Sequence, residues 1–137
     1  MRIIGFNLTK ISGKREDKLE GNLEITQNID IKDISEDPVP FSQDKALRIN
    51  FKFAINYSKG LAEIEFNGFI IILPDKEDLS KIIKDWEDKK IPDETRIPLF
   101  NFIMAKCNVK ALALEDELNL PTHFQMPKLD PNKEKQQ

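Results

Sequence analysis

The chain is poor in the residue types that most often carry out catalysis or bind metals. Among 137 residues it has one cysteine, one histidine and one tryptophan, and its five glycines are scattered. A single cysteine excludes an intramolecular disulfide, and one cysteine with one histidine cannot build the usual metal sites. The glycines form no phosphate-binding loop. We therefore expect no metal site and no cofactor.

The few groups that could act in catalysis have simpler structural interpretations. A pair of Cys107 and His123 is formally possible, but Cys107 falls on an apolar helix stripe, where a thiolate is costly. For His123, a hydrogen bond to the backbone is the simpler interpretation. The carboxylates of Glu63 and Glu65, and those of residues 115–117, are expected on solvated faces. We predict no catalytic residue and a protein that is not an enzyme.

Charge and hydrophobicity also limit the classes of partner. The net charge is −3, with 39% apolar and 33% charged residues, which is typical of a soluble globular domain. No basic patch with interleaved aromatics favours nucleic acid. The start of the chain lacks a signal-peptide core, and the apolar run 69–73 is too short to span a bilayer. We expect a cytoplasmic protein without membrane insertion, with one domain over 1–131 and a disordered tail over 132–137.

The first half of the chain alternates apolar and polar residues, as half-buried strands do. In the first segment Ile4, Phe6 and Leu8 are expected to face the core. A short loop at 58–60 makes a hairpin of the last two segments. The four predicted strands cover residues 4–9, 23–31, 47–57 and 62–73.

Two features of these strands predict what surrounds them. Pro38 and Pro40 rule out a central strand between the second and third segments, where we expect a surface crossover. Phe69, Ile71 and Leu73 make the end of the fourth strand apolar on both faces. We expect a helix over one face there, and a second protomer or a second helix over the other.

A short helix and a long helix follow the strands. Asp75 can cap the short helix, whose single apolar stripe runs from Leu79 to Trp86. The long helix is predicted over Ile91 to Leu118, and Pro98 should either begin its regular part or bend it. It should end near Asn119 because a proline at position 121 disfavours helix just before it.

Beyond the long helix, prolines at 121, 127 and 131 alternate with apolar residues. This spacing predicts an extended strap that lies in a groove. The fold class is therefore α+β: a four-stranded antiparallel sheet in the N-terminal half, followed by a short and a long helix and an extended C-terminal strap.

The long helix carries more apolar surface than one contact can use. It has two adjacent stripes at helical spacing, and only a narrow polar strip remains. A helix that is apolar nearly all round is buried on both sides, which in a short chain predicts a subunit interface. The first stripe is Phe100, Ile103, Met104, Cys107, Ala111, Leu114 and Leu118, and the second is Leu99, Phe102, Ala105, Val109 and Leu112.

The final third of the sequence resembles the SecB-type protein-export chaperones. Pro92, Arg96, a hydrophobic helix from Leu99 and the closing Leu118-Asn119-Leu120-Pro121 are similar to that family's late helix and the turn that ends it. The similarity is strongest over Pro92 to Leu129. The resemblance implies a SecB-like fold, tetramers built as dimers of dimers, and grooves that hold unfolded polypeptides.

Two functions are consistent with these observations. The first is a non-enzymatic SecB-like homo-oligomer, a dimer or a tetramer, that holds unfolded or nascent polypeptides in apolar grooves. The alternative is an oligomeric interaction module whose apolar surface is covered by one dedicated protein partner. The candidate client or interface residues are Leu99, Phe100, Phe102, Ile103, Met104, Val109, Leu112, Phe124 and Met126.

Overall fold

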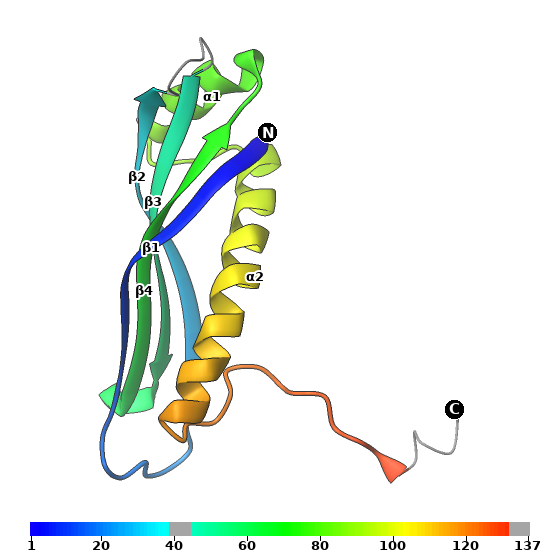
Figure 1. The fold of residues 1–137 in the computed structure, drawn as a ribbon. Coiled ribbons are helices and arrows are strands. Elements are labelled where there is room, and N and C mark those ends of the chain that lie inside the picture. Colours follow the sequence, from blue (N-terminus) through cyan, green and yellow to red (C-terminus); the bar gives the residue numbers. More distant parts are fainter. Residues whose placement is uncertain (39–44, 132–137) are drawn as a thin grey trace.

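The computed structural model describes residues 1–38 and 45–131 and has the predicted α+β architecture. A four-stranded antiparallel sheet is followed by two helices, with the long helix lying along the sheet (Figure 1). The predicted crossover falls largely at 39–44 and the predicted tail at 132–137, outside the described residues. The elements are β1 (Arg2–Arg15), β2 (Ile25–Pro38), β3 (Lys45–Tyr57), the 3-10 turn η1 (Ser58–Gly60), β4 (Ala62–Leu73), α1 (Lys76–Trp86) and α2 (Asp93–Glu117).

The two most regular strands form the centre of the sheet, whose order is β1-β4-β3-β2. Period-two alternation places the apolar residues of β3 and β4 on one face, and that face is the core. Register pairs these residues across the strands, as with Phe53 and Phe66, whose rings stack. The buried members from these two strands include Leu47, Ile49, Phe51, Phe53, Ile55, Tyr57, Ile64, Phe66, Ile70 and Ile72.

The first strand departs from strict alternation. Its pairing with β4 shifts register between Ile3 and Gly5, and again between Leu8 and Lys10. The first shift turns Ile4 outward, 44% exposed, and brings Ile3 to the core beside Phe6. The expectation that Ile4 faces the core is therefore wrong, because a β-bulge changes which residues share a face.

The second face of β4 near its end is apolar, as predicted. Phe69, Ile71 and Leu73 are half-buried there. The guanidinium of Arg48 lies 3.7 Å from the centre of the Phe69 ring and covers part of it. Both helices pack against the opposite face, because their buried residues belong to the core cluster.

The helix boundaries follow local signals with two differences. Asp75 stands at the start of α1, but its backbone oxygen, not its carboxylate, accepts the first hydrogen bonds. Pro98 lies inside the continuous α2 and does not begin it. At the other end Asn119 adopts a left-handed conformation (φ 51°), and the guanidinium of Arg15 donates to the carbonyl oxygens of Leu118 and Asn119.

Candidate polypeptide-binding surface

Only one narrow line of α2 is buried against the sheet. Its members recur at every fourth residue, so they share one side of the helix. Burial raises the pKa of the Cys107 thiol to about 11, so this cysteine is a core residue and not a thiolate nucleophile. The line consists of Thr95, Leu99, Ile103, Cys107, Ala111 and Glu115.

The rest of α2 leaves much of its apolar surface uncovered. Val109 is 69% exposed, and Met104 and Leu112 are half-buried. By length and composition alone α2 could also cross a membrane, yet only 22% of its most apolar 18-residue stretch is buried within the chain. The helix has one side in the core, and on its outer face apolar residues such as Val109 are exposed among charged ones such as Lys106.

The predicted candidates on α2 therefore occupy different settings. Leu99 and Ile103 are fully buried in the core, where a client could not contact them in the folded chain. Phe102 packs edge-on against Phe6 at 5.8 Å, and Phe6 in turn stacks on Phe51. Phe100 lines a groove, Met104 and Leu112 are half-buried beside the core line, and Val109 is exposed. The helix thus separates a core set from a set that a partner can reach.

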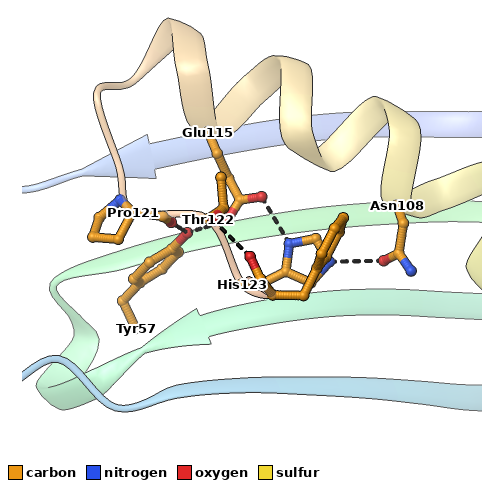
Figure 2. A network of polar contacts seen from close by, with 7 residues as sticks. Tyr57, Asn108, Glu115, Pro121, Thr122 and His123 are labelled. Carbon is orange, nitrogen blue, oxygen red and sulfur yellow. Dashed lines mark hydrogen bonds and ion pairs between the residues drawn. The ribbon is translucent and has the colours of Figure 1, made fainter. Parts of the chain in front are cut away.

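The strap begins with a buried polar network that connects three elements. Figure 2 shows the Tyr57 hydroxyl between the Glu115 carboxylate and the Pro121 carbonyl oxygen, 2.5 Å from each. His123 Nδ1 lies 2.7 Å from Glu115 Oε1, and Nε2 lies 2.8 Å from Asn108 Oδ1. These contacts join the end of β3, the last turns of α2 and the start of the strap.

Each polar atom in this network has a partner. Glu115 is fully buried and accepts from both the Tyr57 hydroxyl and His123 Nδ1–H. Burial and the neighbouring carboxylate raise the pKa of Tyr57, so its hydroxyl stays protonated and donates. Among the described residues no buried side-chain nitrogen or oxygen lacks a hydrogen bond. The network therefore fixes the start of the strap against α2.

Two expectations are corrected here. Glu115 is not on a solvated face, because it continues the buried line of α2 one turn beyond Ala111. His123 bonds to two side chains instead of to the backbone, since the strap turns back beneath the end of the helix. Neither contact could be found without knowing that the strap returns toward the network.

Past His123 the strap leaves the body of the molecule (Figure 1). Phe124 and Met126 are 41% and 43% exposed, and Leu129 is 85% exposed. The expectation that the strap lies in a groove is therefore wrong beyond His123, and before it the hydrogen-bond network holds the strap against the body of the molecule. The strap's apolar side chains find too few partners within one chain.

A groove lies at the other end of α2. It has a volume of about 520 Å³ and is bounded by β2, the end of α1 and the start of α2. Ile29, Ile31, Trp86, Ile91 and Phe100 supply its apolar lining. Such a volume is in the range of ligand sites, ~300–1,000 Å³. The Phe100 side chain is thus placed where an extended ligand could contact it.

Sequence comparisons find no relative of this chain. No protein-family model matches it, and no curated protein does. Among solved structures, the Mycobacterium tuberculosis SecB-like chaperone Rv1957, in complex with a ChAD peptide from the HigA1 antitoxin, aligns with a TM-score of 0.48 and 15% identity. The alignment covers 94% of this chain and 90% of that one.

No cluster that could hold a metal ion occurs among residues 1–38 and 45–131. The residues that sequence reasoning missed are Tyr57, Asn108 and Glu115. One signal was present, since Glu115 follows Cys107 and Ala111 at four-residue steps and so continues an apolar line. A carboxylate on a buried line requires buried donors, and Tyr57 and His123 are the chain's only tyrosine and histidine.

Proposed function

We propose that this protein is a non-enzymatic, SecB-like holdase that binds unfolded or nascent polypeptides and acts as a homo-oligomer in the cytoplasm. Binding an unfolded chain lowers its free concentration and so suppresses its aggregation. Apolar contacts suit this role, because the hydrophobic effect is not directional and accepts unrelated segments. No cofactor is needed for such binding.

One observation carries the proposal: apolar side chains remain exposed on α2 and on the strap at the same time. Val109 on the helix, and Phe124 and Met126 on the strap, are all substantially exposed. Monomeric proteins seldom leave large contiguous apolar surface uncovered. Methionine and phenylalanine on an extended segment can adjust to different sequences, as a binder of many clients requires.

The homo-oligomer uses a different part of this surface in our proposal. The outer face of α2 is regular and rigid, and it shows an apolar stripe to any second copy that approaches. Helix-on-helix packing would cover this stripe. The strap would then remain free for clients, because it leaves the body at the end of α2 (Figure 1).

A second candidate function follows from the same helix. A rigid, regular face such as that of α2 also suits one dedicated protein partner, which would cover the whole stripe. The two functions differ in what remains exposed. A holdase retains apolar surface after assembly, whereas a module with one partner does not.

The test is suppression of client aggregation, followed by light scattering of a chemically unfolded protein on dilution. We expect suppression by the wild-type chain in molar excess, and its loss when both strap residues are replaced, in Phe124→Ser with Met126→Ser. Ile11→Ser is the control, since Ile11 is an exposed isoleucine on β1. No suppression by the wild-type chain would overturn the holdase and favour the dedicated partner.

A further inference from the structure

The groove at the start of α2 combines aromatic walls with positive charge. Trp86, at the end of α1, and Phe100, on α2, are half-buried in its lining. Lys89 Nζ lies 4.7 Å from the Trp86 ring, and the Arg96 guanidinium lies 6.0 Å from the Phe100 ring. Each aromatic wall therefore has a cation beside it.

The charges that line this groove are mostly of one sign. Four cations contribute, from Lys32, Lys89, Lys90 and Arg96, against the single carboxylate of Asp30. Asp30 pairs weakly with Lys32 at 3.9 Å. Asp93 lies outside the lining and pairs with Arg96 at 3.0 Å.

The remaining charges of this region leave two of the cations available. Three further carboxylates, at positions 85, 87 and 88, belong to the same segment but do not line the groove. Within the described part of the chain, neither Lys89 nor Lys90 has a carboxylate within 4.0 Å. These two lysines can therefore pair with carboxylates on a ligand.

The shape of the groove fits an extended chain. One of its walls is β2, which is the outermost strand on that side of the sheet. An outer strand has backbone N–H and C=O groups that a further strand can bond. A register shift between Ile31 and Asp33 interrupts β2 beside Lys32, so pairing is limited to the residues before it. The wall thus suits a short extended segment.

We propose that this groove binds extended polypeptide segments in which apolar or aromatic residues alternate with aspartate or glutamate. The apolar side chains would lie on Trp86 and Phe100, and the carboxylates would meet Lys89 and Lys90. This inference rests on the proposed function for the nature of the ligand, a polypeptide, and adds its charge. The groove therefore selects acidic segments among the clients.

The test uses the only tryptophan as its reporter. Trp86 lines the groove, so a peptide that binds there should change the fluorescence of this residue. The peptide itself contains no tryptophan. The probe is a peptide of about ten residues that alternates Phe or Leu with Asp, compared with the same peptide carrying Lys in place of Asp. Fluorescence anisotropy of labelled peptides gives a second, independent readout.

We expect the acidic peptide to bind at least about tenfold more tightly than the basic one at low salt, and the difference to shrink as salt is raised. Lys89→Glu with Lys90→Glu should reverse the order. The matched control is Lys18→Glu with Lys59→Glu, the same change of charge on exposed lysines outside the groove. Lys59 is a matched position for Lys89, because both residues adopt a left-handed backbone conformation.

Two results would overturn the inference: equal affinity for the two peptides, or loss of preference in the Lys18 and Lys59 control as large as in the groove variant. Suppression of client aggregation, measured on the same preparations, separates this failure from that of the holdase. A wild-type chain that suppresses aggregation but shows no charge preference retains the proposed function and loses this site.

Discussion

Nδ1 of His123 lies 2.7 Å from Oε1 of Glu115, with both side chains almost completely removed from solvent. The same carboxylate accepts the hydroxyl proton of Tyr57. A buried carboxylate is costly unless it is fully hydrogen-bonded, so these two donors make its position possible. The strap, the long helix and the central hairpin therefore depend on one side chain.

Replacing this carboxylate should destabilise the protein strongly. Glu115→Ala leaves a His123 nitrogen buried without its partner and removes one of the two acceptors of the Tyr57 hydroxyl, which should lower the free energy of unfolding by ~3–5 kcal/mol. Urea denaturation measures the change. Glu117→Ala is the control, because Glu117 is exposed two residues further on. It should stay within about 0.5 kcal/mol of the wild type, and equal losses in both variants would contradict the network's role.

The pairing of β1 with β4 should not tolerate a side chain at position 68. A Cβ atom there would overlap the carbonyl oxygen of Asn7 on the neighbouring strand, which cannot move without breaking the β1–β4 pairing. Gly68→Ala should cost at least ~2 kcal/mol of stability. Gly5→Ala, where the nearest atom is a side-chain carbon of Ile71 at 3.4 Å, should cost much less. Thermal unfolding of both variants decides this.

The proposed oligomer should depend on the outer face of α2. Val109→Glu places a charge at an exposed position, so the monomer should fold normally while a helix interface loses several kcal/mol. Light scattering coupled to size exclusion should show a smaller particle. Phe102→Glu should also break the assembly, but it would disturb Phe6 as well. Leu129→Glu on the strap should leave the mass unchanged. An unchanged mass for Val109→Glu would remove this face from the interface.

The stability of the sheet should respond to acid through Glu65. Hydrogen bonds from Lys52 and Lys10 lower the pKa of this carboxyl below its ordinary value of 4.5. A lowered pKa in the folded state gives stability that is present above pH 4.5 and is lost as the pH falls through the folded pKa. The stability difference between wild type and Glu65→Gln should therefore vanish in acid. Denaturation at a series of pH values tests this.

Much of this fold could be predicted from alternation and helical spacing. β3, β4 and α1 follow strict periods because each has one buried face, and the end of α2 follows from Pro121. The position of Ile4 could not be predicted, because a bulge depends on pairing with a distant strand. The contact between Glu115 and His123 could not be predicted either, since it depends on where the strap turns. The path of the strap past His123 follows no period at all.

The placement of the candidate site residues could be predicted only in part, for a similar reason. Two stripes on α2 were visible in the sequence, but the sheet buries a line that takes Leu99 from one stripe and Ile103, Cys107 and Ala111 from the other. Leu99 and Ile103 are buried in the core because they belong to the line from Thr95 to Glu115 that faces the sheet. Val109 lies off this line and is exposed. A pattern that is apolar nearly all round does not specify which side packs first. The groove at Trp86 joins three distant segments and carried no local signal.

The three register shifts described for the sheet all lie in the pairings of its outer strands, and the β3–β4 pairing has none. The centre of the sheet is therefore regular, while both edges are locally bent. Bent edges make poor templates for indefinite strand addition, which is the route to fibres. Although the chain leaves apolar side chains exposed, its sheet is thus a poor template for the addition of further copies.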